Sequence, residues 1–119
     1  MKKILVVDDS ASIRQMVTFT LESGAECHEA ENGVEAFNLC QSTQFDVIIS
    51  DINMPEMDGY ELVKNLRGMS QYKYTPVIML TTESGEAEKL KGREAGATGW
   101  IVKPFNPDKI KKIVDKVSA

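Results

Sequence analysis

Short apolar runs alternate with helix-like segments along this chain, and this alternation restricts its fold more than any other feature. The runs at residues 4–7, 47–50 and 77–80 are almost continuously apolar and rich in Val and Ile. Such runs are typical of strands buried on both faces, as in a parallel sheet covered by helices. A mixed run at residues 27–30 predicts an edge strand, and residues 100–102 form the last run.

Five segments between and after these runs carry apolar residues at helical spacing. They are marked by Ile13, Met16, Val17 and Thr20; by Ala36, Phe37 and Cys40; by Leu62, Val63 and Leu66; by residues 86–95; and by Ile110, Ile113, Val114 and Val117. Gly96 suits the end of the fourth segment, and Asn106 with Pro107 suits the start of the fifth. Strand and helix alternating five times predict an α/β fold, an open five-stranded parallel sheet with helices on both faces.

Composition limits the class of protein. A chain of 119 residues is long enough for one domain with one core. Its net charge of -4 implies no general affinity for nucleic acid. The apolar run behind Lys2 and Lys3 is too short for a signal peptide or a membrane span, so we expect a cytoplasmic protein. Cys27 and Cys40 form no close pair, and we expect free thiols.

Polar residues follow four of the predicted strands, where such sheets bind their ligands. Asp8 and Asp9 follow the first strand, Asp51 the third, Thr81 the fourth and Lys103 the fifth. Because the carboxyl ends of parallel strands meet at one edge of the sheet, we expect these side chains to converge. Each residue alone has an ordinary interpretation, such as a helix cap or a surface lysine, but the joint pattern indicates a site.

The residue types in this set predict a particular chemistry. Three crowded carboxylates repel one another unless a cation lies between them. Oxygen ligands favour Mg²⁺, and no His or Cys stands at these positions to favour zinc. With Lys103 and the Thr81 hydroxyl at the same edge, the set suits phosphoryl transfer to the nucleophile Asp51.

The segments that carry these residues also match a known family. Residues 6–10, 50–59, 80–82 and 102–105 resemble the receiver domains of response regulators, most closely chemotaxis regulators of the CheY type. The resemblance covers the whole chain. It implies a flavodoxin-like strand order of 2-1-3-4-5 and a single receiver domain over residues 1–119 without an output domain. It also implies a phospho-accepting switch rather than an enzyme, although one that assists its own phosphotransfer and dephosphorylation.

The resemblance assigns roles to the residues of the set. Asp51 is implied as the phosphoacceptor, and Asp9 is implied as a Mg²⁺ ligand, with Asp8 acting through water. Thr81 and Lys103 are implied to contact the phosphoryl group.

Three further positions gain roles from the resemblance. Asn53 is implied to offer its backbone carbonyl to the metal, and Asn53 and Glu83 stand where the family tunes dephosphorylation. Trp100 stands at the switch position, where the family usually has Tyr or Phe. An ordinary core or surface aromatic is the alternative for Trp100. His28 lies away from the set, and we expect it to be structural or exposed.

The resemblance also implies partners. We expect a histidine kinase as phosphodonor, a monomer, and no nucleic acid or membrane partner. Output would pass through the face made by the fourth helix, fifth strand and fifth helix, with the flagellar motor switch as the expected target and a phosphatase as a further partner. The last helix carries lysines that form either an ordinary solvated face or a surface for an acidic partner: Lys109, Lys111, Lys112 and Lys116. A phosphorelay intermediate or phosphate sink is the alternative.

Two other classes fit less well. A Mg²⁺-dependent aspartyl phosphatase of the haloacid-dehalogenase type usually has Asp-x-Asp on its first strand, whereas this chain has Asp8-Asp9-Ser10. A flavodoxin-like flavin binder needs a hydroxyl- and glycine-rich loop after that strand, and Asp8 and Asp9 would repel the flavin phosphate.

Overall fold

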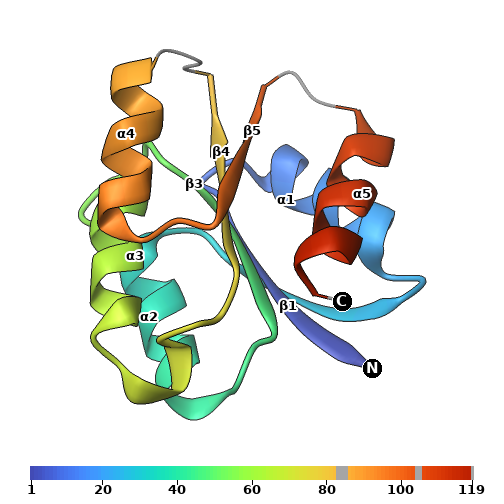
Figure 1. Ribbon diagram of the computed structural model, residues 1–119. Helices are drawn as coiled ribbons and strands as arrows, with labels where there is room; N and C mark the ends of the chain where they lie inside the picture. Colours follow the sequence, from blue (N-terminus) through green and yellow to red (C-terminus); the bar gives the residue numbers. More distant parts are fainter. Residues whose placement is uncertain (83–85, 104–105, 119) are drawn as a thin grey trace.

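Figure 1 shows the chain as a computed structural model, which describes residues 1–82, 86–103 and 106–118. The strands are β1 (Lys2–Val7), β2 (Ala25–Ala30), β3 (Val47–Asp51), β4 (Val77–Thr81) and β5 (Gly99–Val102). The α-helices are α1 (Ala11–Leu21), α2 (Gly33–Ser42), α3 (Gly59–Arg67), α4 (Glu86–Ala95) and α5 (Pro107–Val117). The predicted alternation of strand and helix is confirmed, and a short 3-10 helix, η1 (Ser70–Tyr72), lies outside the prediction.

The strands form one parallel sheet in the predicted order, β2-β1-β3-β4-β5. The mixed strand β2 is at the edge, as expected, but it begins at Ala25, two residues before the predicted run. The register with β1 explains the difference, because Lys2 pairs with Ala25 and Lys3 with Glu26. Pairing with β1 therefore extends the strand beyond the residues whose composition suggested it.

Helices cover both faces of the sheet, which explains the continuous apolar runs. In Figure 1, α1 and α5 lie on one side of the strands and α2, α3 and α4 on the other. Alternate residues of β1 belong to two separate cores: Leu5 and Val7 to one, Ile4 and Val6 to the other. All four side chains are at most 1% exposed, so neither face of this strand tolerates a polar residue.

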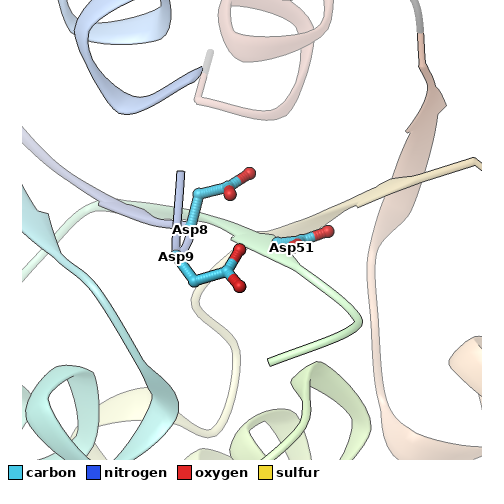
Figure 2. Close-up of side chains that lie close together, drawn as sticks. All are labelled: Asp8, Asp9 and Asp51. Carbon is cyan, nitrogen blue, oxygen red and sulfur yellow. The ribbon is translucent and has the colours of Figure 1, made fainter. Parts of the chain in front are cut away.

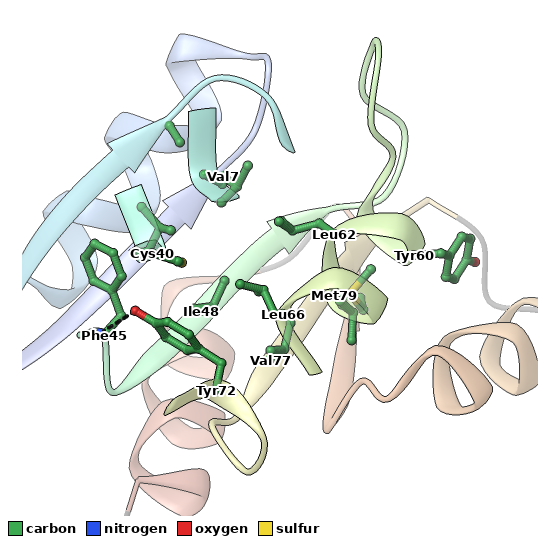
Figure 3. Packing of buried hydrophobic residues seen from close by; sticks show 14 of the residues in the cluster. Val7, Cys40, Phe45, Ile48, Tyr60, Leu62, Leu66, Tyr72, Val77 and Met79 are labelled. Atoms are coloured by element: carbon green, nitrogen blue, oxygen red, sulfur yellow. Dashed lines mark hydrogen bonds between the residues drawn. The ribbon is translucent and has the colours of Figure 1, made fainter. Parts of the chain in front are cut away.

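Tyr72 of η1 closes the core under α2 and α3, as Figure 3 shows. Its hydroxyl accepts a hydrogen bond from the Phe45 N–H at 3.1 Å and donates one to the Thr43 carbonyl. Burial raises the pKa of Tyr72 to about 12, so the hydroxyl keeps its proton and its donor role. The short helix thus anchors the segment before β4 to the segment before β3.

Four of the α-helices, α1, α2, α3 and α5, begin with the same kind of N-cap. The side chains of Ser10, Asn32, Asp58 and Asn106 each accept a hydrogen bond from the backbone N–H three residues later. Gly96 ends α4 with a φ of 109°, as its position predicted. These caps fix where each helix begins after its strand. The connections lie at the carboxyl edge of the sheet, where the site is predicted.

The β3–α3 loop contains one strained residue. Glu56 has a φ of 69°, and the Met57 N–H donates to the Pro55 carbonyl at 2.8 Å, so these three residues form a γ-turn with a left-handed centre. Such a backbone conformation is unfavourable for any residue with a Cβ. The turn places Met57 against the start of α2, where a Cβ on Gly33 would lie 2.7 Å from the Met57 carbonyl oxygen.

Replacing Glu56 with Gly is expected to stabilise the protein. The gain should be roughly 0.5–1 kcal/mol, because relief of left-handed strain outweighs the greater freedom of Gly in the unfolded chain. Urea denaturation measures it. Glu56→Gln is the control, since it removes the charge but keeps the Cβ; an equal gain in both variants would show that charge, not backbone strain, is responsible.

The remaining expectations from composition can also be checked. Cys27 and Cys40 are both free thiols, as expected, and burial raises the pKa of Cys40 to about 11. His28 lies on β2 with its Nε2 2.7 Å from a carboxylate oxygen of Glu26, outside the acidic cluster described below. None of the described helices has the length and apolarity needed to cross a membrane.

Candidate functional site

Three carboxylates meet at the carboxyl ends of β1 and β3 (Figure 2). Asp8 and Asp9 directly follow β1, and Asp51 is the last residue of β3. One oxygen from each carboxylate lies within 4.8 Å of the others. Asp8 and Asp51 are only 1% and 7% exposed, while Asp9 is exposed at the mouth of the cluster. The predicted convergence of these three residues is what the fold produces.

Lys103 brings a positive charge into the cluster. It follows β5, where its backbone N–H donates to the Thr81 carbonyl at 2.6 Å and so keeps the strand ends in register. Its ammonium donates to Asp51 Oδ1 at 3.1 Å and to Asp8 Oδ2 at 3.2 Å. The lysine therefore bridges the two buried carboxylates, and its own side chain is only 18% exposed.

The electrostatics of the site follow from this crowding. Burial, followed by repulsion from Asp8, raises the pKa of the Asp51 carboxyl, although Lys103 acts in the opposite direction. For Lys103, burial favours the neutral amine, but attraction by Asp51 and Asp8 outweighs it and raises the pKa. The Lys103 ammonium therefore stays charged. Its single positive charge does not balance the three carboxylates of the cluster.

Some carboxylate oxygens of the cluster accept hydrogen bonds and others do not. The Ser10 N–H donates to Asp8 Oδ1 at 2.9 Å, so both oxygens of Asp8 are engaged. Asp51 Oδ1 accepts from Ile52 N–H at 3.0 Å as well as from Lys103. Within the described part of the chain, Asp51 Oδ2 and the Asp9 carboxylate accept no hydrogen bond. Since every fully buried side-chain polar atom described has a partner, Asp51 Oδ2 is accessible to solvent.

The donor set fits a hard divalent cation. Its ligands are carboxylate oxygens, and among the residues that the structure describes no His or Cys belongs to the cluster. Mg²⁺ prefers such ligands and retains several waters, which suits a site with one exposed carboxylate. Asn53 is exposed in the loop two residues beyond Asp51.

Thr81 and Trp100 lie beside a small cavity behind the site. Thr81 ends β4 and is 4% exposed, and Trp100 of the neighbouring strand β5 pairs with Met79 of β4. Trp100 is half-buried, and the Arg93 guanidinium lies 5.8 Å from the centre of its ring. The cavity has a volume of about 10 Å³, room for a single water at most. It is lined by Ile52, Tyr60, Met79, Thr81, Glu88, Lys89, Gly92 and Trp100.

One predicted residue is not described by the structure, and one residue near the site was not predicted. Glu83, predicted to tune dephosphorylation, falls outside the described residues. Arg14 of α1 reaches the site unpredicted, since its Nη1 donates to the Asp8 carbonyl at 2.6 Å. No residue pattern could have indicated this contact, because its acceptor is a backbone oxygen, which every residue has.

A doubly wound parallel sheet with a carboxylate cluster, a bridging lysine and a hydroxyl at its carboxyl edge defines a class of phosphoryl-accepting signalling domains. The sequence model of the family described as the response regulator receiver domain matches residues 4–115 of this chain. The chain therefore belongs to the response regulator receiver domain family, the phosphorylation switches of two-component systems.

Individual relatives place the chain near chemotaxis regulators. It is 44% identical to a chemotaxis protein CheY homolog of Campylobacter jejuni, covering 97% of this chain and 91% of the relative. It is also 44% identical to chemotaxis protein CheY1 of Helicobacter pylori, covering 97% and 95%. The solved structure of the chemotaxis response regulator CheY4 of Vibrio cholerae has 54% identity and a TM-score of 0.94, covering 98% of both chains.

Proposed function

We propose that this chain is a chemotaxis switch in which Asp51 accepts a phosphoryl group from a histidine kinase. Phosphorylation then changes the affinity of the face made by α4, β5 and α5 for the flagellar motor switch. The observation that carries the proposal is the Lys103 ammonium, which bridges Asp8 and Asp51 while leaving Asp51 Oδ2 accessible. The similarity to chemotaxis proteins supports the choice of target.

In the proposed reaction, Asp51 Oδ2 attacks the phosphorus of the donor phosphohistidine. A new O–P bond forms, and the leaving imidazole takes the electron pair of the broken P–N bond. Lys103 stabilises the negative charge on the phosphoryl oxygens, and the Thr81 hydroxyl donates to one of them. A bound Mg²⁺ would supply further charge stabilisation to the same oxygens. Asp9 and Asp51 would hold it, with Asp8 through water and the Asn53 carbonyl.

Removing the exposed carboxylate of the cluster is expected to weaken Mg²⁺ binding. Asp9→Asn keeps the shape of the side chain but removes a charged ligand, so the affinity should fall by about tenfold or more. Isothermal calorimetry at fixed ionic strength measures this. Asp46→Asn is the control, because it removes the same charge from an exposed position outside the cluster. Equal affinity in Asp9→Asn and wild type would contradict the assignment of the ligand.

The signal is proposed to leave the site through Thr81 and Trp100. A phosphoryl group on Asp51 adds negative charge and acceptor oxygens, which draw the Thr81 hydroxyl toward them. Trp100 then turns toward the space behind β4 and reshapes the α4–β5–α5 face. This is a shift between two existing arrangements, because a phosphoryl group favours only the state that it contacts better.

The coupling is tested with beryllofluoride, a stable mimic of the phosphoryl group, and the purified flagellar motor switch protein. Activation should raise the partner affinity of the wild type by roughly 5- to 150-fold, the usual range of allosteric coupling. Thr81→Ala and Trp100→Ala should still bind beryllofluoride but gain much less affinity. If both variants gain as much as the wild type, the signal does not pass through these two residues.

A phosphorelay intermediate or phosphate sink is the second candidate. The same Asp51 chemistry would serve it, but the α4–β5–α5 face would need no target. Return of the phosphoryl group to a kinase, without any gain in affinity for the motor switch, would favour this second function.

A further inference from the structure

Arg14 connects the metal-binding loop to the edge of the sheet. Its Nη1 donates to the Asp8 carbonyl at 2.6 Å, and its Nε donates to Glu29 Oε1 at 3.0 Å. The Asp8 N–H in turn donates to the Ala30 carbonyl at 3.1 Å. The residue that begins the acidic loop is therefore held on both sides of its backbone, once by β2 itself and once by Arg14.

The geometry of this contact is more specific than a surface ion pair. The Arg14 side chain is 15% exposed and that of Glu29 is 40% exposed. A guanidinium is planar and presents its N–H groups in a rigid fork, so two acceptors on different sides fix its orientation. Glu29 thus aims Arg14 at the carbonyl of Asp8. A lysine has a single ammonium on a flexible stem and would not reproduce both contacts.

The exposed ligand Asp9 depends on this backbone. Both carboxylate oxygens of Asp8 are engaged by other groups, whereas the Asp9 carboxylate has no hydrogen-bond partner in the described residues. Its position is set only by the backbone that carries it. The peptide that leads into Asp9 contains the carbonyl group of Asp8, and Arg14 donates its hydrogen bond to the oxygen of that group.

We propose that Arg14 is a positioning residue of the metal site, with Glu29 as the group that orients it. Arg14 fixes the peptide between Asp8 and Asp9, so that the Asp9 carboxylate stands where it can share a cation with Asp51. This inference rests on the proposed Mg²⁺ site. It concerns affinity for the cation and assigns Arg14 no contact with the phosphoryl group.

The direction in which Arg14→Ala changes the Mg²⁺ affinity distinguishes a positioning role of Arg14 from an effect of its charge. Arg14 is a cation near a cation site, so its charge alone opposes Mg²⁺ binding. If charge were its only influence, Arg14→Ala would bind Mg²⁺ more tightly. If Arg14 positions the loop, the same variant binds Mg²⁺ more weakly, by about tenfold, as for other groups that orient metal ligands.

Isothermal calorimetry with Mg²⁺ alone, at fixed ionic strength, compares wild type, Arg14→Ala, Arg14→Lys and Glu29→Gln. We expect about tenfold weaker binding in Arg14→Ala and smaller losses in the other two, because each keeps part of the contact. Lys64→Ala is the control, since it removes the same charge from an exposed position of α3 and should leave the affinity unchanged. Thermal melting without metal reports whether each variant is folded.

A second measurement distinguishes affinity from chemistry. At saturating Mg²⁺, the rate of Asp51 phosphorylation by acetyl phosphate should return to near the wild-type value in Arg14→Ala. Unchanged or tighter Mg²⁺ binding in a folded Arg14→Ala would overturn the positioning role but not the metal site. If Arg14→Ala does not fold, the same result in Arg14→Lys and Glu29→Gln would overturn it. A wild type that binds no Mg²⁺ would overturn the metal site and this inference with it.

Discussion

Replacing Asp51 with Asn is expected to abolish specific phosphorylation. Asp51 is the only carboxylate of the cluster that is both bridged by Lys103 and left with an accessible oxygen. Asp8 uses both of its oxygens, and Asp9 has no hydrogen bond to Lys103. An amide is a poor nucleophile, so Asn at this position keeps the shape of the side chain but loses the reaction.

The measurement is mass spectrometry after incubation with acetyl phosphate or a histidine kinase and Mg²⁺. Wild type should carry one phosphoryl group, on Asp51, and its bond should be cleaved by hydroxylamine, as expected for an acyl phosphate. Asp9→Asn is an informative comparison, because it should be labelled slowly rather than not at all. A full label on Asp51→Asn would move the acceptor to another residue.

The same substitution is expected to stabilise the protein in the absence of metal. The folded pKa of Asp51 is raised by burial and by Asp8, so above that pKa the ionised carboxylate disfavours folding. At neutral pH, Asn removes this penalty and should raise the Tm in EDTA. The gain should shrink as the pH falls through the raised pKa of Asp51 toward that of a free aspartate, because the protonated carboxyl no longer carries the charge.

The strands and the position of the site were predictable because burial on two faces leaves a direct mark on the sequence. Ile4, Leu5, Val6 and Val7 belong to two cores at once, and none of the described helices has such a run. Once the strands are known, the rule that ligands bind at their carboxyl ends places Asp8, Asp51 and Lys103 together. The prediction needed no knowledge of side-chain geometry, only of where each strand stops.

What could not be predicted depends on backbone atoms and on distance. The contact of Arg14 ends on a carbonyl, and Tyr72 binds a backbone N–H and a carbonyl of distant residues. Neither acceptor nor donor is distinguished by a residue type. The bridging of Asp8 and Asp51 by one ammonium likewise follows from the register of β4 and β5, which fixes how far Lys103 reaches. The sequence predicts which groups meet, and the packing decides which atoms bond.

The close approach of α3 to the site gives the largest expected effect on stability. Gly59 is the first residue of α3, and its N–H donates to the Ile52 carbonyl at 2.8 Å. A Cβ at this position would lie 2.5 Å from the Asp51 carbonyl oxygen and 2.9 Å from the Ile52 Cα. Both atoms belong to the backbone of β3 and of the loop after it, so no side-chain rotation can relieve the contact.

Gly59→Ala is therefore expected to destabilise the protein by about 3 kcal/mol and to disturb the acceptor. To admit the methyl group, either α3 or the end of β3 must move, and the second movement carries Asp51 away from Lys103. Urea denaturation measures the stability, and labelling by acetyl phosphate under conditions where the variant is folded measures the acceptor. We expect both to fall.

Gly92→Ala is the matched control for this prediction, since it makes the same change in another helix. Among the residues that the structure describes, a Cβ there would meet only Tyr60 Cε1, at an ordinary distance of 3.7 Å. Because Ala is the better helix former, this variant should gain roughly 0.5–1 kcal/mol. Opposite signs for the two glycines would show that the start of α3 is held against the backbone of β3. A neutral or stabilising Gly59→Ala would show instead that the loop beside Asp51 yields to an added methyl group, and that the acceptor is not fixed by the packing of α3.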